Sequence, residues 1–204
     1  MQTSSLLRRI RNAAWIVVAV CLTAGGLYFL TQRAPDIQKA IGGAARIGGP
    51  FQLTAHNGQS FTERDLAGRP YAIFFGFTHC PDICPTTLLD MSNRLEELKG
   101  DGDKLRMVFV TVDPERDTPQ HLAEYLKSFD QRIVGLTGTA AQVAGIAKGY
   151  RVIYEKVPGT NGDYSMNHTA TVYLFDASGQ FASTLAYQEN EQNQRAKIKR
   201  LIGG

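Results

Sequence analysis

The sequence PYAIFFGFTHCPDICPTTLLDMSNRLEELK, residues 70–99, decides the fold class. Its first eight residues form an apolar and aromatic run that is too short for a helix of its own and is typical of a strand buried on both faces of a sheet. From Pro85 onward, apolar residues recur at three- and four-residue spacing, which predicts a helix with a proline in its first turn. The stretch is therefore predicted to form a strand, a loop and a helix.

The segments on either side extend this alternation. Residues 51–55 and 60–62, joined by the turn sequence HNGQ, predict an N-terminal β-hairpin. Further strands are predicted over residues 105–112, 133–136, 152–157, 169–175 and 181–187, and further helices over 118–129, 139–150 and 191–202. This order predicts an α/β fold whose mixed central sheet, mainly parallel in its first half, is flanked by helices on both faces.

The N-terminal region has the composition of a membrane anchor. Residues 13–30, AAWIVVAVCLTAGGLYFL, carry no charge, and as a helix they would span about 27 Å of hydrocarbon. This predicts a single transmembrane helix, with a cleaved signal peptide as the alternative. Three arginines just before the run place the N-terminus in the cytoplasm, so the rest of the chain is expected on the periplasmic side of the inner membrane.

Composition also predicts the domain boundaries. Residues 1–33 are interpreted as a cytoplasmic tail and anchor, residues 34–47 as a linker containing proline and several glycines, and residues 48–204 as one folded domain. The formal net charge is +3, but four arginines lie before the first acidic residue, so the remainder is close to neutral. This distribution argues against a nucleic-acid partner.

Two cysteines, Cys80 and Cys84, follow the buried strand and precede the helix, where open α/β sheets place their functional sites. The dipole of the helix favours the thiolate form that both metal binding and nucleophilic attack require. Pro81 and Pro85 are expected to keep both cysteines out of helical geometry. The sequence thus predicts an accessible, activated thiol pair.

The spacing of the pair leaves metal binding and redox cycling open. A purely structural disulfide would close a very short loop and add little stability. Two thiolates suit Cu(I), zinc or iron–sulfur clusters, but structural zinc sites and clusters usually need four protein ligands. Two cysteines and a histidine form the three-donor set of known copper sites.

Four motifs resemble one known family. They are FGFTHCPDICPTTL at residues 75–88, VTVDPERDTP at 110–119, LTGT at 136–139 and NHTATVYLFD at 167–176. Together they are similar to the Sco (SenC) proteins, which are thioredoxin-like copper chaperones for cytochrome c oxidase. The similarity extends from about residue 48 to the end of the chain.

This resemblance implies both a site and a role. Cys80, Cys84 and His168 would bind copper as Cu(I) or Cu(II), and the two cysteines would form a redox-active disulfide when oxidised. The fold would be a thioredoxin core with an inserted hairpin. The partner would be the oxidase subunit that carries the CuA centre, with other copper chaperones or thioredoxin-like reductants as further partners.

Other side chains near the motifs have smaller expected roles. His79, Asp82 and Asn167 are candidates for contacts with the ligands, and Asn167 stands where the family often has aspartate. His56 and His121 are expected to be solvated. Met166 is interpreted as a packing residue, and DPERD, residues 113–117, as a turn whose charges satisfy backbone donors and one another.

The alternative function is thiol–disulfide oxidoreductase, in which one cysteine attacks a disulfide of the oxidase or another exported protein and the other resolves the mixed disulfide. Thioredoxins use a Cys-x-x-Cys spacing, and the extra residue here argues against efficient redox catalysis. A peroxiredoxin would have threonine three residues before its reactive cysteine, where this chain has Phe77.

Overall fold

The computed structural model describes residues 12, 14–26, 28–29, 47–159 and 162–203. Contacts divide the chain into two compact units, residues 1–45 and 46–204. None of the described helices is long and apolar enough to cross a bilayer, so the predicted transmembrane helix is not found among them.

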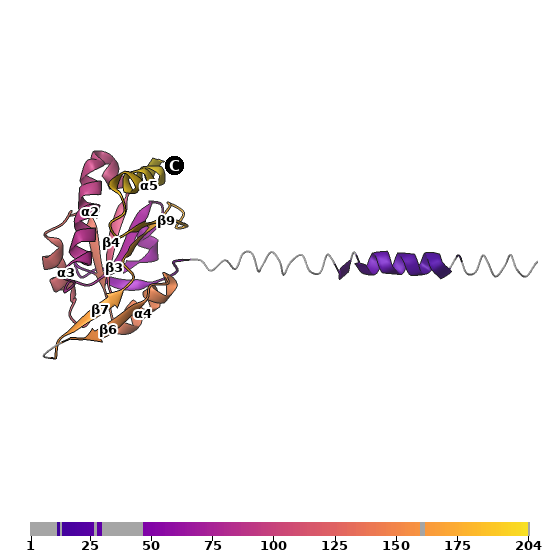
Figure 1. Cartoon of the computed structure of the whole chain (residues 1–204), viewed down its shortest axis with the longest axis horizontal. Helices are drawn as coiled ribbons and strands as arrows, with labels where there is room; N and C mark the ends of the chain where they lie inside the picture. The colour runs from indigo at the N-terminus through magenta and orange to yellow at the C-terminus, as the bar shows by residue number, and fades with distance from the viewer. Residues whose placement is uncertain (1–11, 13, 27, 30–46, 160–161, 204) are drawn as a thin grey trace, which may run out of the picture. The chain divides into compact units, whose positions relative to one another are not determined.

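The second unit is built on a seven-stranded sheet with the strand order β2-β1-β5-β4-β3-β8-β9 (Figure 1). The strands are β1 Gln52–Ala55, β2 Ser60–Thr62, β3 Tyr71–Gly76, β4 Arg106–Thr111, β5 Ile133–Thr137, β8 Thr171–Phe175 and β9 Phe181–Ala186. The central strands β3, β4 and β5 are parallel, whereas the β1–β2 and β8–β9 hairpins extend the sheet in antiparallel fashion at its two edges. The predicted mixed sheet and N-terminal hairpin are confirmed.

Helices cover both faces of this sheet, as predicted. They are α2 Ile83–Glu97, α3 Pro119–Leu126, α4 Ala140–Gly149 and α5 Glu191–Gly203, with 3₁₀ turns η1 at Glu63–Leu66 and η2 at Lys99–Lys104. Successive residues of a strand point to opposite faces. Accordingly, Phe74 packs toward Phe109 and the α3 residue Tyr125, whereas Phe75 contacts Tyr150 at the end of α4.

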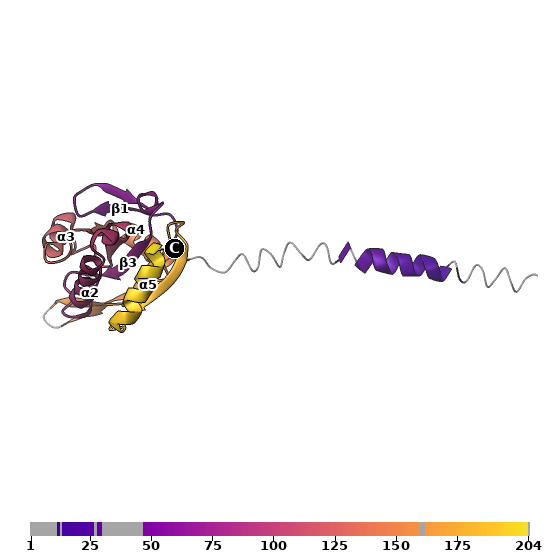
Figure 2. The ribbon, with the colours of Figure 1, turned by 90° about the horizontal axis from the view of Figure 1, so that it is seen from above.

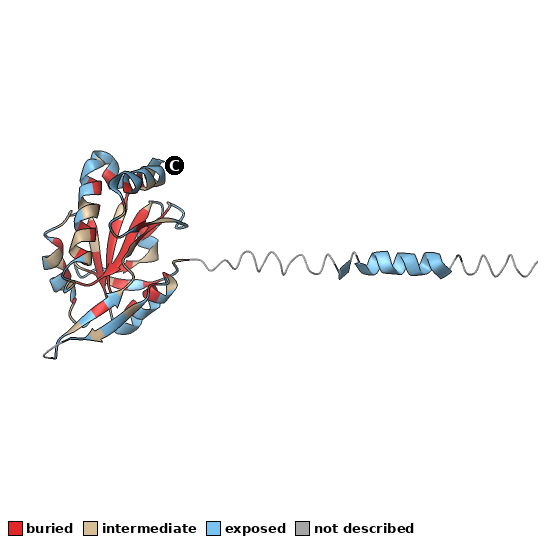
Figure 3. Ribbon diagram, viewed as in Figure 1, coloured by how far each residue is buried: buried red, intermediate tan, exposed pale blue. Residues whose placement is uncertain are grey.

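The core lies along the central strands. All six residues of β3 are buried, and Figure 3 shows the buried residues concentrated in the middle of the sheet. Helices α2 and α5 lie side by side over one face (Figures 1 and 2), where Arg94 of α2 and Glu191 of α5 form an ion pair at 3.5 Å. This core fixes the end of β3 from which the cysteine loop leaves the sheet.

A separate hairpin, formed by β6 Tyr154–Pro158 and β7 Tyr164–His168, differs from the expectation drawn from the residues alone. The sequence predicted the first strand, a turn, and then a histidine immediately before the next strand of the main sheet. Instead, residues 164–168 pair with β6, and Tyr154 lies opposite His168. This region fits the inserted hairpin that the family resemblance implied, and it carries His168 at its end.

The start of α2 also differs from the prediction. The helix begins at Ile83, so Cys84 lies in its first turn and is fully buried, not held outside the helix. Pro85 does not prevent this, because the first residues of a helix have no N–H partner within it. Gly76 makes room for the thiol: a Cβ at that position would lie 2.7 Å from Cys84 Sγ and 2.8 Å from Phe109 Cε2.

We expect Gly76→Ala to lower the free energy of unfolding by about 1–3 kcal/mol, because the added methyl group overpacks two fully buried side chains. The matched control is Gly145→Ala in α4, where an added Cβ meets nothing within 4 Å. That change should be neutral or stabilise by up to about 1 kcal/mol. Denaturant unfolding of both variants measures the difference; equal effects would contradict the packing described here.

Candidate metal centre

Three elements bring Cys80, Cys84 and His168 together. Cys80 lies in the loop after β3, Cys84 in the first turn of α2, and His168 at the end of β7. Their donor atoms all lie within 4.8 Å of one another. Cys84 Sγ is 3.4 Å from His168 Nε2, and the Cys84 backbone N–H donates to Cys80 Sγ at 3.4 Å. Residues distant in sequence thus present two sulfurs and one imidazole to a common point.

The ring of His168 is held in one orientation. Its Nδ1 lies 3.2 Å from the carbonyl oxygen of Thr169, which can only accept, so Nδ1 carries the proton. The neutral ring then has its lone pair on Nε2, the atom that faces Cys84 Sγ. Phe74 and Phe77 pack edge to face against the imidazole. A ligand histidine is commonly fixed by such a bond from its other nitrogen.

The two thiols differ in their affinity for a proton. A hydrogen bond from the Cys84 side chain is the main cause that lowers the pKa of Cys80 to about 3, with further bonds from the backbone N–H groups of Cys84 and Asp82, although partial burial opposes this. The pKa of Cys84 is raised, first by its bond to Cys80 and then by burial. The pair therefore carries one proton, which resides on Cys84 and leaves Cys80 as the thiolate.

The three residues predicted to contact the ligands do so unequally. Asp82 donates through its backbone N–H to Cys80, while its carboxylate bonds to Thr86. His79 has its Nδ1 3.1 Å from Thr78 Oγ1, and its ring is stacked on that of His121. Asn167 is exposed and lies opposite Glu155 in the hairpin.

The loop DPERD, residues 113–117, forms the predicted turn, in which Arg116 pairs with Asp113, and it also fixes the cysteine loop. Asp117 is fully buried and accepts from the Thr78 backbone N–H at 3.1 Å and from Thr78 Oγ1 at 2.6 Å. Thr111 Oγ1 donates to the same carboxylate at 2.5 Å. One side chain therefore joins β4 to the residues just before Cys80.

The same loop fixes the hairpin that carries His168. Tyr164 donates its hydroxyl to Asp113 at 2.8 Å, and partial burial together with this bond raises the pKa of Tyr164 to about 12. Arg116 forms an ion pair with Asp113, donates to the Tyr164 carbonyl at 3.0 Å, and lies 3.7 Å from the centre of the Tyr164 ring. The loop thus positions both halves of the site.

Sequence reasoning overlooked several of these supporting residues. The pattern of DPERD predicts only a turn, and nothing in it indicates that Asp113 and Arg116 contact Tyr164, nearly 50 residues later in the chain. His56 was expected to be solvated, but its Nδ1 accepts from the Gly135 N–H at 3.0 Å. Met166 is buried in the core, as predicted for a packing residue.

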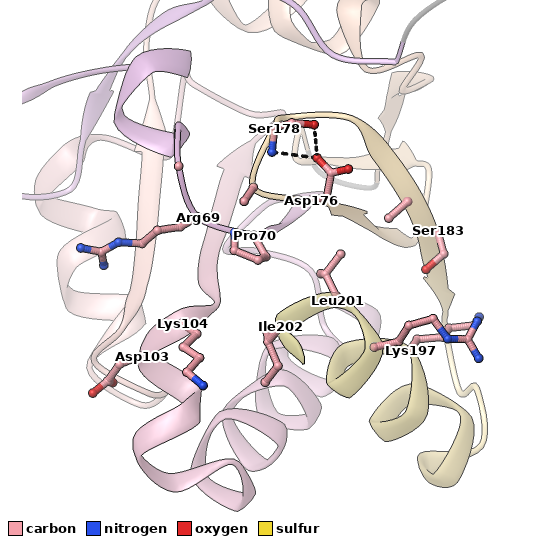
Figure 4. Close-up of a pocket in the computed structure, with 14 residues that line it drawn as sticks. Arg69, Pro70, Asp103, Lys104, Asp176, Ser178, Ser183, Lys197, Leu201 and Ile202 are labelled. Atoms are coloured by element: carbon pink, nitrogen blue, oxygen red, sulfur yellow. Dashed lines mark hydrogen bonds between the residues drawn. The ribbon is translucent and has the colours of Figure 1, made fainter. Parts of the chain in front are cut away.

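A groove of about 860 Å³ lies apart from the thiols, between the β8–β9 turn and the C-terminal helix (Figure 4). It is lined in part by Arg69, Lys104 and Lys197, and Asp176 accepts two hydrogen bonds from Ser178 at its edge. None of Cys80, Cys84 and His168 lines it. The candidate site therefore lies outside this groove, with Cys80 and His168 partly exposed and Cys84 buried.

Comparison with known proteins gives one consistent result. A family model described as SCO1/SenC matches residues 39–203. The mitochondrial protein SCO2 of Saccharomyces cerevisiae is 39% identical over 197 residues, covering 91% of this chain and 65% of the yeast protein. The mitochondrial SCO1 homologue of mouse is 42% identical over 166 residues, covering 78% of this chain and 58% of its own length. The chain thus spans less than two thirds of either relative.

Among solved structures, Bradyrhizobium japonicum ScoI with copper bound superposes with a TM-score of 0.72 at 47% identity. The match covers 76% of this chain and 99% of the ScoI chain. The resemblance inferred from the four motifs, including the thioredoxin-like fold, is confirmed.

We expect an alkylating agent to modify Cys80 before Cys84, because Cys80 is half-buried and ionised while Cys84 is fully buried and protonated. With a pKa of about 3, Cys80 remains a thiolate as the pH rises, so its rate should stay nearly constant between about pH 5 and 8. The measurement is alkylation by mass spectrometry in a Cys21→Ser background. A rate that rose about tenfold per pH unit over this range would contradict the assignment.

Tyr164→Phe should displace the hairpin that carries His168, because it removes the bond to Asp113. We expect a loss of about 1 kcal/mol in the free energy of unfolding. Changes to residues that position metal ligands lower metal affinity by about 10- to 100-fold. We therefore also expect this variant to bind metal at the thiols about 10-fold more weakly. Tyr173→Phe, on the main sheet, is the matched control and should leave metal affinity unchanged.

Proposed function

The chain belongs to the SCO1/SenC family, and on that premise we propose that it binds one copper ion through Cys80 Sγ, Cys84 Sγ and His168 Nε2. The observation that carries the proposal is the convergence of these three donors within 4.8 Å. Two sulfurs suit Cu(I), and the added imidazole lets the same set hold Cu(II). The relative from B. japonicum, 47% identical, is described with copper bound.

The chemistry of the site fits reversible capture. Cys80 is already a thiolate, so copper needs to displace only the proton of Cys84. The lone pair of His168 is directed toward the same point by its bond to Thr169. A copper ion would therefore complete a donor set that is assembled before it arrives, at little cost in reorganisation.

We further propose that the protein passes this copper to the CuA-bearing subunit of cytochrome c oxidase, as its family resemblance implies. The uncharged run over residues 13–30 supports a membrane-anchored chain, with residues 1–33 as tail and anchor, 34–47 as linker and 48–204 as the copper-binding domain on the periplasmic side. This arrangement would keep the site close to a membrane-embedded target.

A second candidate function rests on the unequal thiols. Cys80 as a thiolate could attack a target disulfide and form a mixed disulfide with the target. Cys84 would then attack the sulfur of Cys80 in that mixed disulfide. The target would gain two electrons and be released as a dithiol, while Cys80 and Cys84 would be left joined as a disulfide. The low pKa of Cys80 and its partial exposure favour this chemistry.

Copper binding tests the first function. The full chain, reduced and purified in detergent, should bind about one Cu(I) at the proposed site. Changes to residues that position metal ligands lower metal affinity by roughly 10- to 100-fold, and replacing a ligand itself should lower it further. We therefore expect Cys80→Ser, Cys84→Ser and His168→Ala each to weaken binding by at least about 100-fold in competition with a chelator.

The matched control is Cys21→Ser, which removes the one cysteine outside the site and should leave this affinity unchanged. Unchanged affinity in His168→Ala would remove histidine from the proposed ligand set. The reductase function predicts instead that Cys84→Ser accumulates a mixed disulfide through Cys80 with an oxidised target peptide, while His168→Ala still reduces the peptide.

A further inference from the structure

A second cluster of metal-type donors lies beside the first. In the part of the chain that the structure describes, two groups of three His, Cys, Asp or Glu side chains bring their donor atoms within 4.8 Å of one another. One is the thiol and histidine set already described. The other consists of His79, Asp117 and His121. The function proposed above makes no use of the second group as ligands.

The fold gathers these three residues from two separate segments. His79 is exposed in the cysteine loop, and His121 is exposed in the first turn of α3. Their rings lie nearly parallel, with centroids 5.5 Å apart and an angle of 19° between the planes. Asp117 is fully buried in the adjoining loop. Two solvent-accessible imidazoles therefore lie next to one buried carboxylate.

Asp117 retains capacity for one more partner. A carboxylate offers about four acceptor positions, and the described residues fill three of them: Thr78 N–H and Thr111 Oγ1 donate to Oδ2, and Thr78 Oγ1 donates to Oδ1. A position on Oδ1 remains. Thr78 also contacts His79 Nδ1 at 3.1 Å, which links the imidazole to the carboxylate and fixes its orientation. The group is thus partly preorganised.

We propose that His79, His121 and Asp117 form a second metal site, which takes a borderline divalent cation such as Cu(II) or Zn(II). Two imidazoles and a carboxylate suit these ions, whereas Cu(I) prefers thiolates and Mg²⁺ or Ca²⁺ prefers oxygen donors alone. Between the two, the general order of affinities favours Cu(II). Ligand atoms of a tetrahedral site with bonds of about 2.1 Å lie about 3.4 Å apart, so the exposed rings would close slightly around the ion.

The position of this second site gives it a relation to the thiols. His79 is the residue directly before Cys80, so an ion held there lies beside the cysteine loop. The site would serve as an outer position for copper on its way to or from the thiol set. This role rests on the proposed copper function, but binding of the ion does not.

The test uses the full chain in detergent with Cys21, Cys80 and Cys84 all replaced by serine, so that no thiol remains to bind or reduce Cu(II). Titration with Cu(II), followed by electron paramagnetic resonance, should show about one bound ion per chain with hyperfine coupling to imidazole nitrogen. Adding His79→Ala or His121→Ala should lower the affinity by at least about 10-fold. His56→Asn removes a histidine elsewhere and is the matched control, for which no change is expected.

Two results would overturn the proposal. One is the absence of stoichiometric Cu(II) binding by the thiol-free chain; the other is binding that survives His121→Ala but is lost in His168→Ala. His121 is exposed, so His121→Ala tests the proposed site even if His79→Ala disturbs the fold. Circular dichroism would reveal such a disturbance. Because the test contains no thiols, its failure would leave the function proposed for Cys80 and Cys84 untouched.

Discussion

The buried carboxylate of Asp117 is the interaction on which the rest of the site depends. Without exposure to water, it relies on Thr78 and Thr111 for its hydrogen bonds, and these bonds tie the residue two places before Cys80 to the end of β4. A buried charge is stable only when such partners are present. The same five-residue loop holds Tyr164 through Asp113 and Arg116, so the two segments that supply sulfur and nitrogen share one support.

Because one loop holds both segments in place, the two sulfurs can differ in environment while their positions stay fixed. Cys84 is enclosed by α2 and β3, where the absence of a side chain at Gly76 leaves its sulfur just enough room. Cys80 is partly exposed in the loop, and its sulfur accepts hydrogen bonds that stabilise the thiolate. The fold therefore separates the two sulfurs by environment although they are only four residues apart. Such a division suits both ion capture and disulfide chemistry.

Much of this architecture follows from the sequence by general rules. The apolar run before the cysteines and the periodic helix after them identified the central unit, and the alternation of elements identified the sheet class. The start of α2 was misplaced because proline is tolerated in the first turn of a helix, so Pro85 did not keep Cys84 outside it. The strand ending at His168 was missed because it is defined by pairing with β6, and its mostly unburied residues form no apolar pattern. The histidine itself came from family resemblance, because an isolated histidine carries no signal of ligation.

The complete burial of Cys84 has a consequence for how an ion could leave. An incoming ligand from another protein cannot approach a bound metal past that sulfur, since α2 and the sheet close off that side. Approach is open only where Cys80 and His168 are partly exposed. If the site binds copper as proposed, exchange would be sequential and one-sided: the outer donors would be replaced first and the enclosed sulfur last, so that the ion would keep a protein ligand throughout the transfer.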